Sequence, residues 1–467
     1  MLIPNMMRTV IKLYKYLILL FFLLCCFLHT HAYDFKVDGI YYNILNESEV
    51  AVTYGAMDAP PGRYAYSGDV VVPSTVTYSG VSYSVVAIGH SAFINDYNLN
   101  SITLPNSIKT IDESAFLKLP ITTLDIPSSV DTIGDYAFYG CTNLETIKLA
   151  NTSIKRIGKG TFLECWALSS LSFPESLEEI DESAFAGCKS IQTIELPNNL
   201  KSIGFGAFGS CENLTSIKVP ISVLSIGGCA FQSCSKLEFA VLPNSLDSIG
   251  SYVFDECPNL VNIKLPTSLK EIPKGLFKGC EKLELSELPS TITSIGDEAF
   301  SGCKSISSII LLNSISSIGT HAFYDCIGLN TVISEIEEPF AIDKEVFHNT
   351  NYPNHALLMV PYGTISKYKQ FIGWTWRFNE IKETPLNHLL TINSTGNGSV
   401  VYNSTNVRNS SQTFKEEESS SATISFTPDS GYRIKSVKVN STDVTSSVYN
   451  NSYNLQHYWR YVRGSRF

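Results

Sequence analysis

Hydrophobic and polar positions recur along this chain with a period of about 23 residues, from residue 88 to residue 347. Each period carries one phenylalanine, and an isoleucine stands five residues before it without exception. The step is 23 residues, with one step of 22 and two of 24, and the phenylalanines stand at positions 93, 116, 138, 162, 185, 208, 231, 254, 277, 300, 323 and 347. A fixed period of this length is typical of a solenoid, in which each unit buries its apolar face against its neighbours.

One pattern within each period is Leu-x-x-Ile-x-Leu-Pro, as in Leu214–Pro220 and Leu260–Pro266. Apolar residues two positions apart alternate with other residues, which predicts a half-buried strand of about three or four residues. The proline ends hydrogen bonding along the strand and turns the chain towards the next unit. Parallel strands from about eleven coils would form one sheet roughly 50 Å long.

The other pattern is Ile-Gly-x-x-Ala-Phe-x-x-Cys, as in Ile295–Cys303. Alanine, phenylalanine and cysteine at positions i, i+1 and i+4 share one face of a helical turn, so the pattern predicts a short helical turn. Pro273 takes the glycine position in one coil, which argues against a left-handed backbone there and favours a helix N-cap. Together the patterns predict a solenoid of about 12 coils of 23 residues, with a parallel sheet and short helical turns.

The pattern changes on both sides of the repeats. Short alternating stretches with Gly, Pro and Ser breaks precede them, and Thr350 stands where the next cysteine would be, before an aromatic stretch with Trp374 and Trp376. We expect that stretch to hold a last strand and a short aromatic helix. The predicted segments are a signal peptide over 1–32, an N-terminal β cap over 33–87, the repeat array over 88–347, a C-terminal cap over 348–383, a linker over 384–388, a small all-β module over 389–453 and an atypical basic tail over 454–467.

The N-terminus predicts export. Arg8, Lys12 and Lys15 precede the apolar run 16–28, and a small residue, Ala32, follows it. This order is typical of a secretory signal, and the run is shorter than the about 20 residues of a membrane span. We therefore expect cleavage near Ala32 and a mature protein that is secreted or held at the cell surface, with any membrane contact through an unidentified anchor.

The charge balance restricts the partners. The formal net charge is −10, and it becomes −13 without the leader, since 31 basic residues then face 44 acidic ones. Such a chain is a poor match for nucleic acid or an anionic membrane surface as the main partner.

The cysteines follow the repeat. Two of the twelve lie in the leader, Cys229 is off register, and nine occupy one repeat position, at Cys141, Cys165, Cys188, Cys211, Cys234, Cys257, Cys280, Cys303 and Cys326. An odd number of equivalent positions is not a disulfide framework, so we interpret them as a structural ladder of small buried hydrophobic residues. The chain has no Cys-x2-Cys pair or Cys/His cluster, and we expect neither a metal nor another cofactor.

Catalytic motifs are missing from the sequence. It contains no Gly-x-Ser-x-Gly, His-Glu-x-x-His or phosphate loop. The paired carboxylates Asp112-Glu113 and Asp181-Glu182 stand where the predicted helical turns begin, where negative side chains are stabilised as caps. We therefore expect a protein that is not an enzyme.

The combined motif Leu-x-x-Ile-x-Leu-Pro-x-Ser-Ile-x-x-Ile-Gly-x-x-Ala-Phe-x-Gly-Cys resembles the BspA-type leucine-rich repeat of Bacteroides-type bacteria, over about 88–347. The stretch 389–450 is similar to small β repeats related to the internalin B-repeat, and the similarity stops at Asn454. The resemblance implies a leucine-rich repeat solenoid followed by a small all-β module. It also implies an exported or surface-displayed binding protein, since some relatives are adhesins for host matrix proteins or other cells.

A candidate binding surface follows from the outward positions of the predicted strands. The apolar candidates are Phe239, Val241, Leu285, Ile310 and Ile333, and the basic ones are Lys218 and Lys264. An exposed apolar patch on a polar sheet would contact a protein or polysaccharide ligand. Two simpler interpretations stay open: the C-terminal flank covers the apolar residues, and the lysines alternate with Glu195 and Glu287 on a merely solvated face. An architectural spacer without a dedicated ligand is the alternative function.

Overall fold

The computed structural model describes residues 33–55, 65–285, 287–350 and 356–384, together with the backbone of strands between Asn387 and Asn454. The predicted signal peptide, residues 385 and 386 of the predicted linker and the tail beyond Asn454 lie outside the described residues. The chain divides into two compact units. The first extends to Leu358 and also holds Lys369–Glu380, whereas the second holds Met359–Tyr368 and the chain from Ile381 onward.

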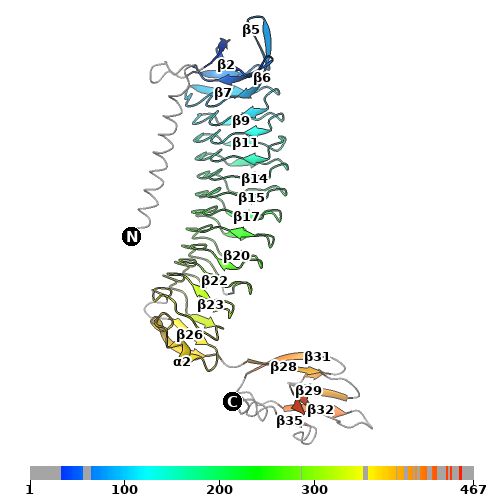
Figure 1. Ribbon diagram of the computed structural model, residues 1–467, viewed down its shortest axis with the longest axis vertical. Coiled ribbons are helices and arrows are strands. Elements are labelled where there is room, and N and C mark those ends of the chain that lie inside the picture. The colour runs from blue at the N-terminus through cyan, green and yellow to red at the C-terminus, as the bar shows by residue number, and fades with distance from the viewer. Residues whose placement is uncertain are drawn as a thin grey trace. The chain divides into compact units, whose positions relative to one another are not determined.

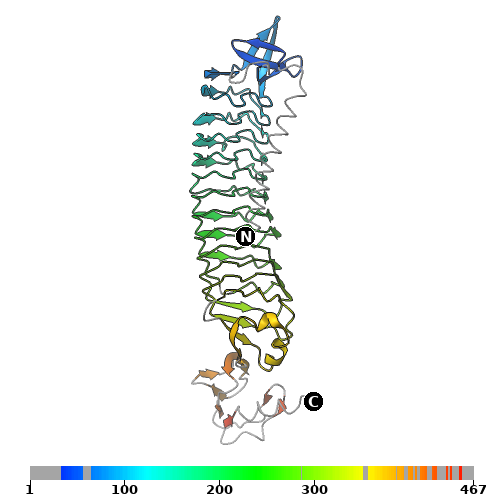
Figure 2. The same cartoon turned by 90° about the vertical axis from the view of Figure 1, so that its left-hand side faces the viewer.

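The predicted solenoid is confirmed. Successive coils of the first unit stack in chain order, with each coil next to the one that precedes it (Figures 1 and 2). The strand of the Leu-x-x-Ile pattern pairs in parallel with the equivalent strand one repeat away, for example Ser216 with Phe239 and Phe239 with Asn262. These long strands are β7 (Leu99–Thr103), β9 (Thr123–Asp125), β11 (Thr146–Lys148), β13 (Ser170–Ser172), β16 (Ser216–Lys218), β18 (Phe239–Val241), β20 (Asn262–Lys264), β23 (Ser308–Leu311) and β25 (Thr331–Ser334).

The long strands do not form the single sheet that was predicted. They form separate groups in which β9, β11 and β13 pair, then β16, β18 and β20, and then β23 and β25. Strands this short hold few hydrogen bonds per coil, so the loss of one bond interrupts the ladder. The coil between β13 and β16 still accepts a bond from Thr215 N–H at the carbonyl of Gln192, at 3.0 Å.

A second row of strands was not predicted. Each strand has only two residues and ends on the isoleucine that precedes the glycine position, and neighbours again pair in parallel. The short strands are β8 (Thr110–Ile111), β10 (Thr132–Ile133), β12 (Arg156–Ile157), β14 (Glu179–Ile180), β15 (Ser202–Ile203), β17 (Ser225–Ile226), β19 (Ser248–Ile249), β21 (Glu271–Ile272), β22 (Ser294–Ile295) and β24 (Ser317–Ile318).

The predicted helical turns are wrong in kind, although the buried face is right. Between the short strand and the cysteine the chain makes turns without helix, and every fourth residue has a left-handed backbone, such as Glu298 (φ 56°) and Gly302 (φ 76°). Ala299 and Phe300 between them are fully buried, as the pattern predicted. A regular helix of L-residues does not contain such left-handed positions.

Hydrogen bonding explains why turns replace a helix. The amide of Ala299 donates within its own coil, to the carbonyl of Gly296 at 3.3 Å, whereas the next amide, Phe300, donates to Ala322 of the following coil at 2.8 Å. This alternation recurs along the array. A helix would direct its bonds along its own axis, whereas the turns connect each coil to the next one through the main chain.

The glycines after the isoleucines have a different cause from the predicted N-cap. None of them has a positive φ, but a Cβ at Gly134 would lie 2.4 Å from the backbone nitrogen of Glu113 in the preceding coil. Close approach of neighbouring backbones therefore favours glycine here. At Asp343, which takes the glycine position in the last coil, the carboxylate accepts the N–H of Glu345 at 2.8 Å and stabilises the turn.

The core is a continuous stack of the twelve repeat phenylalanines. Neighbouring ring centroids lie 5.2 to 6.0 Å apart at every step, and the ring planes are close to parallel. At one end, the ring centroid of Tyr66 lies 4.6 Å from that of the first phenylalanine, Phe93. At the other end, the ring centroid of Trp374 lies 6.1 Å from that of the last phenylalanine, Phe347. The stack therefore has an aromatic residue from each flank at its ends.

The N-terminal flank extends both rows of strands. Its sheet has the order β1-β2-β3-β6-β8-β10 and so joins the short strands, while β4 pairs in parallel with the first long strand, β7. The strands of this flank are β1 (Phe35–Val37), β2 (Ile40–Ile44), β3 (Glu49–Thr53), β4 (Gly68–Val71), β5 (Thr75–Tyr78) and β6 (Val81–Ile88).

The C-terminal flank contains β26 (Ala356–Val360), where a last strand was predicted, and two very short helical segments where a short aromatic helix was predicted. It has only α2 (Ile365–Tyr368) and the 3-10 turn η1 (Ile372–Trp374), and the chain then enters β27 (Phe378–Glu383). The chain beyond contains antiparallel strands, in the groups β28-β31, β30-β29-β32-β35 and β33-β34. These are β28 (Asn387–Asn393), β29 (Gly398–Tyr402), β30 (Thr405–Val407), β31 (Ser411–Glu417), β32 (Thr423–Pro428), β33 (Lys438–Val439), β34 (Thr442–Asp443) and β35 (Ser452–Asn454).

Candidate functional site

The outward side of the long strands, here the long-strand face, carries the residues that the sequence singled out. In β18 the side chains alternate, since Phe239 and Val241 are 49% and 51% exposed while Ala240 between them is buried. Parallel pairing places Val241 between Lys218 of β16 and Lys264 of β20. We call Lys218, Phe239, Val241 and Lys264 the central patch.

Both lysines of the central patch point into solvent. Lys218 and Lys264 are exposed, and no ion pair among the described residues includes either of them. The patch therefore combines an exposed aromatic ring and an aliphatic side chain with two ammonium groups that have no carboxylate partner in the described part of the chain.

The other predicted contact residues lie elsewhere on the same face. Ile310 of β23 pairs with Ile333 of β25, and both side chains are half-buried. Leu285 is also half-buried, and its coil has no long strand in the described residues. The structure thus brings Phe239 and Val241 together with the two lysines, but it does not join them to the three apolar residues further along.

Many charged residues outside the long strands differ from the two lysines of the central patch, because they form ion pairs with residues of a neighbouring coil. The partners stand 20 to 25 residues apart in the sequence, which is about one repeat. Such exposed pairs contribute between about 0 and 1 kcal/mol each. The pairs are Arg156 with Asp135 and Asp181, Lys159 with Glu182, Lys189 with Glu212, Lys201 with Glu178, Lys274 with Asp297, Lys278 with Glu298, and Lys304 with Glu281.

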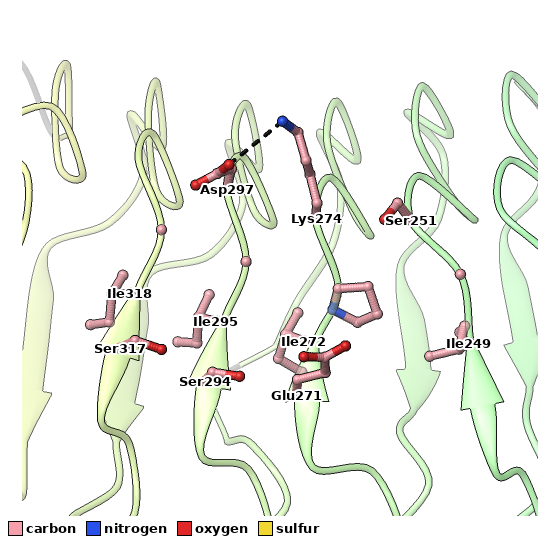
Figure 3. Close-up of a pocket in the computed structure, with 14 residues that line it drawn as sticks. Ile249, Ser251, Glu271, Ile272, Lys274, Ser294, Ile295, Asp297, Ser317 and Ile318 are labelled. Carbon is pink, nitrogen blue, oxygen red and sulfur yellow. Dashed lines mark ion pairs between the residues drawn. The ribbon is translucent and has the colours of Figure 1, made fainter.

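A shallow groove of about 500 Å³ lies along the short strands β19, β21, β22 and β24 (Figure 3). Its floor includes the buried Ile272 and Ile295, the hydroxyl of Ser294 lines it, and the pair Lys274–Asp297, at 3.5 Å, stands beside it. The lining contains hydroxyl and carboxylate groups but no histidine, cysteine or aromatic ring. The sequence patterns missed this groove because they did not predict the short strands.

The repeat cysteines lie in equivalent buried positions. Each thiol lies 3.0 to 3.3 Å from the carbonyl oxygen of the phenylalanine in the preceding coil, to which it can donate. Thr350, which replaces the next cysteine, donates its hydroxyl to Phe323 in the same way at 3.2 Å. Burial raises the pKa of the Cys141 and Cys326 thiols to about 12, which leaves them protonated and poor nucleophiles.

The off-register Cys229 occupies one of the left-handed positions, with φ 57°, where other coils have serine, tyrosine, glutamate, histidine or glycine. It is buried, and burial raises its pKa to about 11. All ten cysteines of the described chain are free thiols.

The carboxylates do not assemble a reactive centre in the described residues. Asp181 accepts the N–H of Glu182 at 2.6 Å and pairs with Arg156, while burial raises the pKa of Asp112. No group of three or more His, Cys, Asp or Glu side chains in the described part of the chain could hold a metal ion. Within the same residues no helix is long and apolar enough to span a membrane.

Comparison with known families identifies the repeat. The BspA type leucine rich repeat region matches residues 74–188, 155–284 and 270–368, which together cover more than half of the chain. The chain belongs to the BspA-type leucine-rich repeat family. The BspA-type match includes both rows of strands and the central patch. A comparison with curated protein sequences gave no match.

Several solved structures are similar to this chain. The pneumococcal vaccine antigen PcpA is 20% identical, with a TM-score of 0.51 over 77% of this chain and 100% of that one. A leucine-rich repeat protein from Bacteroides ovatus is 26% identical, with a TM-score of 0.48 over 70% of this chain and all of that one. A leucine rich cell surface protein from Faecalibacterium prausnitzii is 21% identical, with a TM-score of 0.40 over 75% and 95% of the two chains. At these identities the likeness to PcpA concerns the fold.

Proposed function

We propose that this protein is an exported, adhesin-like binding protein that uses the long-strand face to hold a protein or polysaccharide ligand outside the cell. The observation that carries the proposal is the central patch. Phe239 and Val241 are each about half exposed on a face whose neighbouring strands present Ser216 and Asn262. An exposed aromatic and aliphatic pair on a polar surface is typical of a contact site.

Export rests on the leader sequence at residues 1–32 and on the family, since a relative from Faecalibacterium prausnitzii is described as a cell surface protein. Binding rather than catalysis agrees with the chemistry of the described residues. The groove beside Ser294 has no nucleophile paired with a base, and the repeat thiols are buried hydrogen-bond donors.

The test is binding of the mature chain, residues 33–467, to a panel of immobilised matrix proteins and polysaccharides. The variant Phe239→Ser/Val241→Ser removes the exposed apolar side chains without touching the core. The matched control is Phe205→Ser/Leu224→Ser, which changes two residues of similar exposure, 55% and 46%, beside the short strands β15 and β17. Circular dichroism confirms that each variant is folded.

We expect saturable binding to at least one component and a loss of at least about tenfold in affinity for the patch variant alone, equal to about 1.4 kcal/mol. Equal binding by wild type and the patch variant would contradict the site. No binding to any component of the panel would favour the architectural alternative, a spacer without a dedicated ligand.

A further inference from the structure

We infer that the central patch binds an extended polypeptide segment with two acidic side chains about three residues apart and an apolar side chain between them. The inference rests on the proposed function, because it assigns a ligand class to the same patch. Three features of the structure carry it: the order of charges along the face, the exposed apolar pair, and the distance between coils.

The charged side chains follow a symmetric order along one row of outward positions, with one residue per coil. The row reads Glu195, Lys218, Val241, Lys264 and Glu287, and all four charged side chains are exposed. Lys218 and Lys264 make no ion pair among the described residues. Between Glu195 and Glu287, this row therefore carries positive charge at only two positions, with an apolar side chain between them and a carboxylate beyond each.

This order selects among anionic partners. A uniformly sulfated polysaccharide laid along the row would meet Glu195 and Glu287 as well as the lysines, and like charges repel. A second copy of this chain, related by a twofold axis through Val241, would set Lys218 against the partner's Lys264. A segment with only two carboxylates satisfies both lysines without meeting the flanking glutamates.

The spacing selects an extended backbone. The two lysines are two coils apart, which is about 10 Å at the usual separation of paired strands. A polyproline II segment has three residues per turn and a rise of about 3.1 Å, so residues i and i+3 point the same way about 9 Å apart. In a flat strand, residues i and i+2 are only about 7 Å apart. The two side chains between the acids would then point to either side of the row, about 120° away from the acids, and the one on the side of Phe239 would lie against its ring.

The probe is a fluorescein-labelled synthetic peptide, Gly-Pro-Asp-Leu-Pro-Asp-Pro-Gly, titrated with the mature chain and followed by anisotropy. We expect saturable binding that weakens as salt rises, because screening acts on exposed charges. Reversal of both lysines, Lys218→Glu/Lys264→Glu, should weaken it by at least about tenfold. The control is Lys148→Glu, which reverses an exposed lysine on the same face whose neighbours in the adjacent strands are Asp125 and Ser172. It should change the affinity for the peptide by less than about twofold.

Three results of the titration would overturn the inference. The first is equal binding of a probe with lysine in place of both aspartates, and the second is binding that survives the double reversal. The third is tighter binding of a heparin fragment than of the peptide, lost on the same reversal, which would indicate a polyanion surface. If panel binding depends on Phe239 and Val241 but not on the two lysines, the proposed function stands and this inference falls.

Discussion

At the scale of single residues, the repeat positions are explained by hydrogen bonding as well as by burial. The phenylalanine carbonyls from Phe138 to Phe300, with the exception of Phe254, accept the amide of their own coil's cysteine, and each of them also lies within reach of the thiol of the next coil. A thiol is small, apolar and a weak donor, which suits a buried slot that holds one acceptor. The hydroxyl of Thr350 in the same place shows that the slot accepts another donor.

The first residue-scale prediction concerns thiol reactivity. The ten cysteines of the mature chain should not react with Ellman's reagent at pH 8 in the folded protein, because burial shields them and raises their pKa. All ten should react in guanidinium chloride. A Phe239→Cys variant supplies the control, since it adds one thiol at an exposed position. Fast labelling of native thiols, or fewer than ten after unfolding without reductant, would contradict the free, buried ladder.

The second residue-scale prediction concerns Asp255, which is 7% exposed. Its Oδ2 accepts from Gln232 at 2.6 Å, its Oδ1 has no hydrogen-bond partner, and burial raises its pKa to about 6. Glu256 and Glu298 raise that pKa further, while Gln232 and Lys278 lower it. Because the folded pKa lies above the ordinary value, the folded state binds more protons between pH 4 and 6, and stability falls as pH rises through that range.

The variant Asp255→Asn should therefore raise the melting temperature at pH 8 and have little effect near pH 4. The gain is at most about 3 kcal/mol, because one pKa unit is about 1.4 kcal/mol. Thermal unfolding from pH 4 to 8 measures it, with the exposed Asp247→Asn as control. A destabilised Asn variant at pH 8 would show that the ionised carboxylate is held by a favourable partner.

At the scale of elements, the sequence predicted what is periodic and missed what is not. The 23-residue recurrence of Ile, Phe and Cys was enough for the solenoid and its buried face. The left-handed turn positions escaped because they accept Ser183, Tyr252, Glu298 or Gly206, so no residue type marks them. A strand of two residues is too short to show an alternating pattern, so the short strands were missed, and with them the groove at Ser294.

The flanking aromatic residues make an element-scale prediction possible. Trp374 is fully buried against Phe347, and its indole N–H donates to the Phe340 carbonyl at 2.7 Å. Trp374→Ala should destabilise the C-terminal coils by about 3–5 kcal/mol. The neighbouring Trp376→Ala is the control, because Trp376 is 53% exposed.

Hydrogen exchange should show where that loss occurs. In a solenoid each coil depends mainly on its neighbours, so protection should fall around Phe323 and Phe347 and stay unchanged around Phe116. A uniform loss of protection along the array would show instead that the coils unfold as one cooperative unit.

At the scale of the whole molecule, a coil is the unit that can be removed. Deletion of residues 163–185 removes one full repeat and keeps the register of the phenylalanine stack and of the strand rows. The shortened chain should stay folded and keep its panel binding, since the central patch starts at Lys218. Deletion of about half a repeat at the same place should abolish cooperative unfolding. Loss of binding on the full-repeat deletion would mean that the ligand needs a longer surface.

The central claim is that the long-strand face, at Phe239 and Val241, is the side of the solenoid that a partner covers. Hydroxyl-radical footprinting of the unmodified mature chain tests it most directly, on the component of the panel that binds. The account predicts that the bound partner lowers the oxidation of Phe239, while Phe205 and Trp166, which are similarly exposed but lie outside the long strands, stay unprotected. Protection of Phe205 or Trp166 with Phe239 unchanged would contradict it.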